Sequence, residues 1–210
     1  MITWASSDGR EDGGSHVVPA ASTIKIFVAS AFWRSSLDPA ERVEVPHVPW
    51  SVADRLAGPL TLADCSVLML AFSDNAATNV LLDRLGLEAV NAEAGRLGAE
   101  RTAVRRQMMA QGPENVTCAA DLARGIAAID DPRVLEPLLV AHDSELPLRL
   151  HGREVLVKTG EIWPRVYHEV ALVDRHLGVA VCSEPAALPG EVAAVAAEVV
   201  ASSLDRGETT

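Results

Sequence analysis

The chain has 210 residues, of which 49% are hydrophobic, and a formal net charge of −11 at pH 7. This length and apolar content suffice for one compact unit or for two interleaved subdomains. The acidic balance disfavours nucleic acid and anionic membranes as partners, and no apolar run reaches membrane-spanning length.

The amino terminus lacks the basic and apolar regions of a secretory signal. We therefore expect a cytoplasmic protein as the sequence stands, and an extracytoplasmic one if a leader has been removed. Cys65, Cys118 and Cys182 are odd in number and have no C-x-x-C spacing, which favours reduced thiols that fill the core.

The predicted elements begin as strands, continue as helices and end as strands. Residues 1–18 predict a short strand, a Gly-rich turn and a second extended segment. Apolar periodicity and capping residues predict helices over residues 20–35, 62–72, 76–85, 88–97, 118–129 and 133–142. Val-rich stretches over 154–158, 167–174 and 177–183 predict an antiparallel meander, on which an Ala/Val-rich helix over 190–204 packs.

The predicted fold class is α/β (α+β), with an antiparallel sheet from both termini flanked by helices and an inserted all-helical subdomain. The whole chain, 1–210, would form one domain. Its sheet part would comprise 1–36 and 146–210, and its helical subdomain 37–145.

Both lysines of the chain lie in motifs that need an amine. Lys25 closes the S-x-x-K sequence that begins at Ser22, Lys158 opens Lys158-Thr159-Gly160, and Ser73-Asp74-Asn75 lies between them. The i, i+3 spacing places Ser22 and Lys25 on one helix face, so that the amine can activate the hydroxyl. Burial and the second cation would lower the pKa of Lys25. Arginine could not serve, since its guanidinium keeps its proton.

Each motif alone has a simpler interpretation. The S-x-x-K pair could be an ordinary helix pair, Ser73-Asp74-Asn75 a turn or helix cap, and Lys158-Thr159-Gly160 the end of an edge strand. Their joint occurrence in this order favours a catalytic site.

With these motifs the chain resembles the serine β-lactamase and penicillin-recognising enzyme superfamily. The resemblance is greatest to class A β-lactamases and to small β-lactamase-like hydrolases of actinobacteria. It spans nearly the whole chain and is carried by Pro19–Lys25, Phe72–Asn79, Asn115–Thr117, Asp121–Ala123 and Val157–Gly160.

The resemblance implies a role for each motif residue. Ser22 would be the acylated nucleophile, and Lys25 its base or proton relay. Ser73 would pass a proton to the leaving nitrogen, and Asn75 would bind the substrate amide. Lys158 and Thr159 would hold the substrate carboxylate, while the N–H groups of Ser22 and Glu161 would form the oxyanion hole. The implied catalytic set is Ser22, Lys25, Ser73 and Lys158, and the implied substrate-binding set is Asn75, Thr159, Gly160 and Glu161.

The sequence departs from the class A pattern at three places. The long amino-terminal helix before the nucleophile is missing, which leaves a face exposed or covered by a partner. The E-x-x-L-N pattern, whose glutamate activates the deacylating water, is absent. In the matching segment, 105–115, Glu114 is the only carboxylate. We interpret it as a solvated residue rather than a base. Glu161 stands where the family has a small or hydroxyl residue, and its charge would repel an anionic substrate.

Other candidates have weaker signals. His168 lies in a strand and fits packing better than catalysis. Trp163 and Tyr167 would either floor a pocket or cover the sheet edge. His151 and His176 show no ligand spacing, so we expect neither a metal nor a cofactor.

The predicted function is a serine hydrolase of the S-x-x-K type. It would act on an amide or β-lactam bond through an acyl-Ser22 intermediate, with slow deacylation. The alternatives are an acyl transferase, peptidase or esterase of specialised metabolism, or a non-catalytic ligand-binding protein. The expected partner is a small-molecule amide, lactam or ester, and a second copy of the chain is one candidate to cover the missing-helix face.

Overall fold

A computed structural model of the chain describes residues 1–56, 58–140 and 144–205. The strands are β1 (Ile2–Ser6), β2 (Glu11–Asp12), β3 (Val18–Pro19), β4 (Arg42–Val43), β5 (Leu60–Thr61), β6 (Val116–Thr117), β7 (Val155–Ile162), β8 (Val166–Val173) and β9 (Leu177–Ser183). The α-helices are α1 (Lys25–Arg34), α2 (Leu62–Ala71), α3 (Asn75–Leu85), α4 (Leu87–Arg96), α5 (Ala119–Ala127), α6 (Pro132–Leu135), α7 (Leu146–Arg149) and α8 (Pro189–Leu204). Short 3-10 helices span Ala21–Ile24, Ala53–Arg55 and Glu136–Val140.

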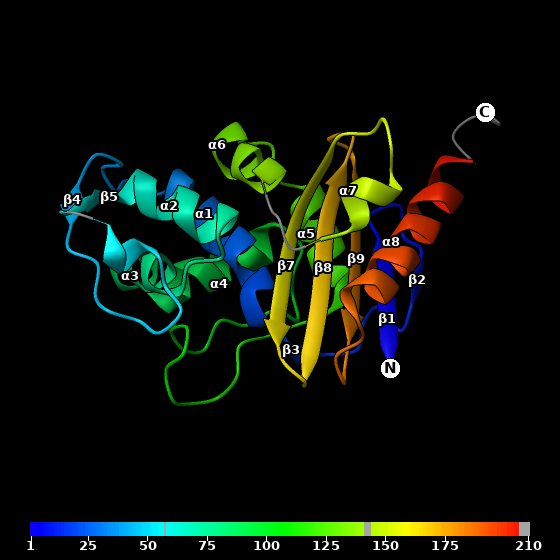
Figure 1. The fold of residues 1–210 in the computed structure, drawn as a ribbon, viewed down its shortest axis with the longest axis horizontal. Coiled ribbons are helices and arrows are strands. Elements are labelled where there is room, and N and C mark those ends of the chain that lie inside the picture. Colours follow the sequence, from blue (N-terminus) through cyan, green and yellow to red (C-terminus); the bar gives the residue numbers. More distant parts are fainter. Residues whose placement is uncertain (57, 141–143, 206–210) are drawn as a thin grey trace.

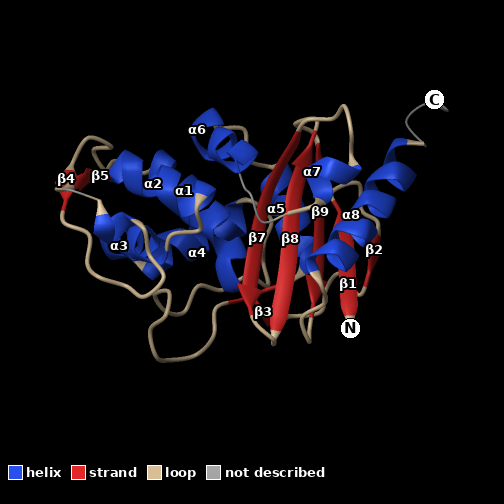
Figure 2. Ribbon diagram, viewed as in Figure 1, coloured by secondary structure: helices blue, strands red, loops and turns tan. Residues whose placement is uncertain are grey.

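The main sheet combines strands from both ends of the chain. Its order is β2-β1-β9-β8-β7, and each neighbouring pair is antiparallel. Figures 1 and 2 show this sheet on one side of the molecule and helices α1 to α4 on the other. The predicted fold class is therefore confirmed.

Helices cover both faces of the sheet, so every residue of β8 and β9 is buried. On one face, α8 packs with α7 over a cluster that includes Val157, Val179 and Leu146. Because α7 and α8 bury these strands, no second chain is needed to cover β8 and β9. The expectation of a partner stays a prediction.

Helix α5 covers the opposite face of the sheet, although it lies within residues 37–145, the predicted helical subdomain. It packs against β9, β1 and β8. At Gly178 a Cβ would lie 2.2 Å from the carbonyl oxygen of Ala123, so a side chain there would push helix and strand apart.

Helix α1 is the buried link between the sheet and the other helices. Ile26, Phe27, Val28 and Phe32 are nearly inaccessible, and α1 contacts α2, α3, α4 and α6. The chain enters α1 from the 3-10 helix Ala21–Ile24, which packs against β7. The start of this predicted helix is thus 3-10, and the α-helix begins at Lys25.

Two further differences concern element ends. Strand β7 continues through the K-T-G motif to Ile162, because β8 pairs with it as far as the Ile162–Val166 partners. The helix predicted over 133–142 is α6 followed by a 3-10 segment ending at Val140, and residues 141–142 lie outside the described residues. In the part of the chain that the structure describes, no helix has the length and apolarity needed to cross a bilayer.

Candidate active site

The amine of Lys25 lies against the Ser73-Asp74-Asn75 turn. It donates to the carbonyl oxygen of Ser73 at 2.5 Å, to Ser73 Oγ at 3.1 Å and to Asn75 Oδ1 at 2.9 Å. No hydrogen bond joins it to Ser22 Oγ among the described residues. The structure therefore connects the S-x-x-K lysine to the second motif, rather than directly to the serine of its own motif.

The environment of Lys25 lowers the pKa of its amine. The side chain is 0% exposed. Burial is the largest cause that lowers its pKa well below the usual value, the charge of Lys158 lowers it further, and Asp74 opposes the shift. A neutral amine can accept a proton, which is the property that a base needs.

Lys158 approaches the same hydroxyl from the sheet. Its amine donates to Ser73 Oγ at 3.1 Å and to the carbonyl oxygen of Thr159 at 2.8 Å. Ser73 Oγ therefore lies between two amines, one from helix α1 and one from strand β7. The three motifs of the sequence meet at this atom.

Backbone conformation places both serines of the site. Ala21, directly before Ser22, has φ +49°, and Ser73 has φ +55°. Residues other than glycine adopt this left-handed region at a cost of about 1–3 kcal/mol, and such residues cluster at functional sites.

Gly160 permits the close approach of β7 to the segment that contains Ser22. A Cβ on Gly160 would lie 2.9 Å from the backbone nitrogens of both Ser22 and Thr23. Any side chain would force strand and 3-10 helix apart, which explains why this motif requires glycine.

Asp74 is a structural residue of the site that the sequence analysis did not single out. Its buried carboxylate accepts hydrogen bonds from Ser51 Oγ and from the N–H groups of Val52, Ala53 and Ala77. Burial raises its pKa, but these hydrogen bonds outweigh that effect and hold the pKa below its usual value. Asp74 thereby ties the loop at residues 51–53 to the start of α3.

The loop at 105–115 is fixed by two asparagines. Asn79 in α3 accepts from the N–H of Met108 at 2.8 Å and donates to its carbonyl oxygen at 3.1 Å. Asn115 accepts from the N–H groups of Arg105 and Arg106 and donates to the Arg106 carbonyl. Met108 is thus held beside the site, in a cavity that Glu114 and Glu161 also line.

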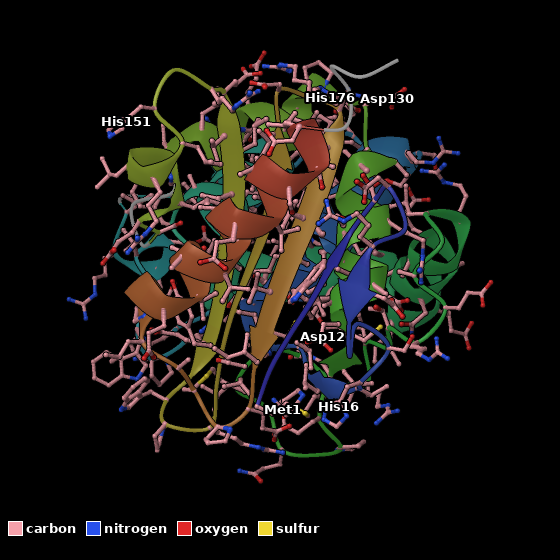
Figure 3. All side chains as sticks on the ribbon, turned by 90° about the vertical axis from the view of Figure 1, so that its right-hand side faces the viewer. Met1, Asp12, His16, Asp130, His151 and His176 are labelled. Atoms are coloured by element: carbon pink, nitrogen blue, oxygen red, sulfur yellow. The ribbon has the colours of Figure 1, made fainter. Side chains whose placement is uncertain are left out.

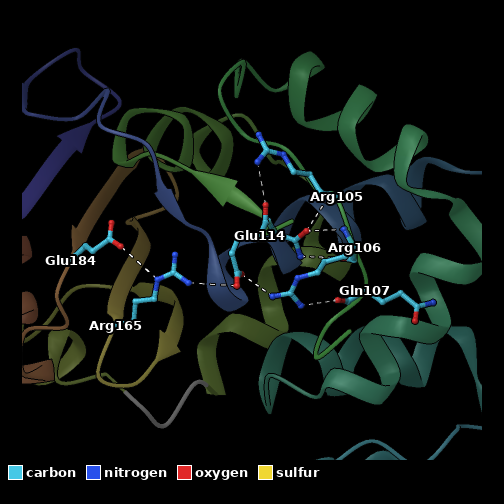
Figure 4. A network of polar contacts seen from close by, with 7 residues as sticks. Arg105, Arg106, Gln107, Glu114, Arg165 and Glu184 are labelled. Atoms are coloured by element: carbon cyan, nitrogen blue, oxygen red, sulfur yellow. Dashed lines mark hydrogen bonds and ion pairs between the residues drawn. The ribbon is translucent and has the colours of Figure 1, made fainter. Parts of the chain in front are cut away.

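The polar side chains of this loop turn away from Ser22 or pair with arginine. Gln107 donates to Asp83. Glu114 pairs with Arg106 at 2.8 Å and with Arg165 at 3.6 Å, so both of its oxygens face guanidinium groups (Figure 4). Glu114 is therefore an ion-paired residue, not the freely solvated one that the sequence suggested.

Two cavities meet at Ser22. The first has a volume of about 330 Å³ and is lined by Ser22, Ser73, Thr159, Gly160, Glu161, Tyr167 and Pro189. The second, of about 290 Å³, is lined by Ala21, Ser22, Asn75, Arg106, Met108, Met109, Ala110, Glu114, Asn115, Glu161 and Ile162. Ser22 and Glu161 line both cavities, so a ligand can extend in either direction from Ser22.

The other histidines and aromatic residues that the sequence analysis considered lie in different surroundings. His168 is buried, its Nε2–H donates to the Pro19 carbonyl at 2.8 Å, and burial is the main cause that lowers its pKa. Since Nδ1 accepts from the N–H of Ser183, His168 is a packing residue, as we expected. Tyr167 lines a cavity, whereas Trp163 is 60% exposed. His151 and His176 lie well apart from each other (Figure 3).

The cysteines lie outside both cavities. Cys65, Cys118 and Cys182 are free and buried, which confirms the expectation of core-filling thiols. Burial is the main cause that raises the pKa of Cys118 to about 11 and of Cys65 to about 12. Such thiols remain protonated and unreactive at neutral pH.

The sequence pattern that defines the Beta-lactamase enzyme family matches residues 7–200. The chain belongs to this family. The family match and the fold together support a serine hydrolase of the β-lactamase type. Among curated proteins, none matches the sequence significantly.

Solved structures share the fold at low sequence identity. A β-lactamase from Sphaerobacter thermophilus is 24% identical, with a TM-score of 0.80 and coverage of 100% of this chain and 91% of that one. The class A β-lactamase of the last common ancestor of Gram-negative bacteria is 21% identical, with a TM-score of 0.83 and coverage of 96% of this chain and 93% of that one. PBP-A is 22% identical, with a TM-score of 0.79 and coverage of 100% and 89%.

Proposed function

We propose that this β-lactamase family protein is a serine hydrolase that cleaves an amide or β-lactam bond through an ester on Ser22, and that it releases the acyl group slowly. The observation that carries the proposal is the convergence of a buried amine of lowered pKa, Lys25, and a second amine, Lys158, on Ser73 Oγ beside Ser22.

Acylation begins with attack of Ser22 Oγ on the substrate carbonyl carbon. Lys25 takes the hydroxyl proton, and the N–H groups of Ser22 and Glu161 stabilise the negative charge that forms on the carbonyl oxygen. Since no hydrogen bond joins Ser22 Oγ to Lys25 in the described residues, the two must close up when substrate binds. Such tightening is usual between free and substrate-bound enzymes.

Cleavage then requires a proton on the leaving nitrogen. Ser73 Oγ lies 3.1 Å from each lysine amine and lines the first cavity, so it can transfer a proton from the lysines to the nitrogen. The C–N bond breaks, the Ser22 ester remains, and the nitrogen leaves as an amine. In a lactam this amine stays tethered to the acyl group.

The remaining contacts would orient the substrate. Asn75 Oδ1 already accepts from Lys25, and its amide nitrogen is available to an acyl-side carbonyl in the second cavity. Lys158 and Thr159 would bind the polar end of the leaving group near the first cavity. Gly160 keeps the strand close to the nucleophile.

Slow deacylation follows from the loop at 105–115. A base positioned for the hydrolytic water contributes about 10²–10⁴-fold, and the thioether of Met108 cannot act as one. With the ester exposed to the cavity and no carboxylate beside it other than ion-paired Glu114 and exposed Glu161, an added amine or alcohol could take the acyl group in place of water. This makes acyl transfer the second candidate function.

The test is covalent labelling by a fluorescent penicillin. The wild type should form a stable adduct on the peptide that contains Ser22, and Ser22→Ala should form none. Equal labelling of both proteins would refute the nucleophile. Absence of labelling from both, with unchanged ligand affinity in Ser22→Ala, would favour a non-catalytic binding protein.

A further inference from the structure

The second cavity of the site lies between two walls that are far apart in the sequence. One wall is the loop at 105–115, which contributes Met109 and Glu114 among others. The other wall is the end of β7, which contributes Glu161 and Ile162. The separation of these two walls therefore sets the space that a substrate group can occupy in this cavity.

The tip of the loop, residues 109–113, is held at its two ends. All five residues of the tip are exposed. Within the part of the chain that the structure describes, the tip makes one hydrogen bond, donated by the N–H of Ala110 to a carbonyl oxygen of the same loop at 3.4 Å. Asn79 holds the start of the tip through the Met108 backbone, and ion pairs of Glu114 hold its end. A segment with exposed backbone and few bonds opens at a low cost in free energy.

An ion pair attaches the end of the tip to the other wall. Arg165 Nη1 lies 3.6 Å from Glu114 Oε1, and Figure 4 shows the guanidinium between Glu114 and Glu184. Arg165 belongs to the hairpin between β7 and β8, where its N–H donates to the carbonyl oxygen of Ile162, a residue of the cavity wall. The pair therefore joins the loop to the hairpin.

The second ion pair of Glu114 stays within the loop. Arg106 Nη2 donates to Glu114 Oε2 at 2.8 Å, so this contact shapes the loop but does not fix its distance from β7. Of the ion pairs between described residues, only the one with Arg165 joins the two walls. Half of the Arg165 side chain is exposed, so this pair is weak and sensitive to salt.

We propose that the Arg165–Glu114 ion pair sets the width of the second cavity, and thereby restricts the acyl groups that Ser22 accepts to those with small side chains. Asn75, the proposed contact of the acyl-side carbonyl, lines this cavity, so the acyl side chain extends toward the loop. A side chain larger than the cavity must displace the tip, which separates the two charges. Arg165 is thus a positioning residue that acts through Glu114. This inference rests on the proposed acylation of Ser22.

The test compares two penicillins that differ only in the size of the acyl side chain, which is phenylacetyl in one and 4-biphenylacetyl in the other. Intact-mass spectrometry gives the rate constant for acylation by each, and the wild type should prefer the smaller compound. In Arg165→Gln, the rate constant for the biphenyl compound should rise roughly two- to fivefold, as for the loss of one half-exposed ion pair. The rate constant for the phenylacetyl compound should not change.

Further variants and salt assign the effect to this ion pair. Glu114→Gln should change the ratio of the two rate constants in the same direction, whereas Arg165→Lys should retain the wild-type ratio. Glu184→Gln is the matched control, because it removes the other carboxylate near Arg165, at 3.7 Å, and leaves the pair between the walls intact. Sodium chloride at about 1 M should bring the wild-type ratio to that of Arg165→Gln, and should not change the ratio of that variant.

A ratio that Arg165→Gln does not change, or an equal increase in both rate constants, would overturn the inference. If neither penicillin acylates the wild type, the proposed nucleophile fails, and calorimetric binding to Ser22→Ala tests the ion pair separately. Binding of the biphenyl compound that becomes tighter, relative to the phenylacetyl compound, when Arg165→Gln is added would support the inference. An unchanged ratio of the dissociation constants would refute it.

Discussion

The two sides of Ser22 differ in the chemistry that they offer. On the lysine side, Lys25, Lys158 and Ser73 form a connected hydrogen-bond network, in which burial lowers the pKa of the Lys25 amine. On the loop side, the Met108 backbone is held by two hydrogen bonds with Asn79, which donates one and accepts the other. Hydrogen bonds hold both sides in place, but of the residues named here only those on the lysine side can transfer protons.

This contrast separates the two halves of hydrolysis. Formation of the ester needs a base for the serine and an acid for the leaving nitrogen, and in the proposed mechanism the lysine side would supply both. Removal of the ester needs a base for water, which the loop side lacks. A protein with these two sides would be acylated efficiently and would release the acyl group slowly.

The largest expected effect is on the lysine side. Lys25→Arg should reduce the acylation rate by about 10²–10⁴-fold, as Lys25→Ala should, because a guanidinium cannot accept the serine proton. The measurement is the rate of fluorescent penicillin labelling. Arg34→Lys, at the other end of α1, is the matched control and should label normally. Substantial labelling by Lys25→Arg would show that another group is the base.

The next effect tests the loop side by adding a carboxylate at position 108. Met108→Glu places a carboxylate in the cavity that contains Ser22, and should shorten the lifetime of the acyl-enzyme by about 10²-fold or more. Met108→Gln has nearly the same size but no base, and should leave the lifetime unchanged. The lifetime is read by intact mass after excess penicillin is removed. Equal lifetimes for the two variants would mean that a missing base does not limit turnover.

A smaller effect concerns the anchor of the lysine side. Asp74→Asn should lower the free energy of unfolding at pH 7 by about 1–3 kcal/mol, because buried hydrogen-bond donors at residues 51–53 lose a charged partner. Since the pKa of Asp74 is lowered in the folded protein, its contribution is fully present above the pKa of an unfolded aspartate, about 3.9, and is lost as the pH falls through the lower pKa of the folded state. Chemical denaturation should therefore show that the free energy of unfolding changes less between pH 7 and pH 3 in Asp74→Asn than in the wild type.

The smallest effect is expected for the anchor of the loop side. Asn79→Ala removes both hydrogen bonds to Met108 and should cost about 1–2 kcal/mol of stability, with little change in acylation rate. Thermal unfolding and penicillin labelling measure the two quantities. A large loss of labelling in a folded Asn79→Ala variant would show that the two sides of Ser22 are not independent.

The sequence predicted the fold and the meeting of its motifs because both depend on short-range signals. The Val-rich stretches after Gly152 have a clear strand pattern, and β7, β8 and β9 pair as predicted. The two lysines are rare residues in matching motifs, and their amines meet at Ser73 Oγ. The roles of these residues in catalysis stay predictions.

Features that depend on the path of loops were not predictable. Asp74 binds residues 51–53 from more than twenty positions away, and those residues have no periodic pattern that would reveal the contact. In the sequence, Glu169 is one polar residue in a strand, with no sign that it is buried. Its burial results from the helices on both faces of the sheet. The orientation of Lys25 toward Ser73 and Asn75 likewise depends on tertiary packing, which i, i+3 spacing does not specify.

The central claim, fast acylation of Ser22 and slow release, is tested most directly by one time course. Protein is mixed with a penicillin in slight excess, and intact mass is recorded from seconds to hours while product is quantified in the same samples. We predict a mass increase of one penicillin per chain that forms early and persists for minutes or longer, with product released only as the adduct decays. Many turnovers within that time, with no adduct detected, would contradict the account.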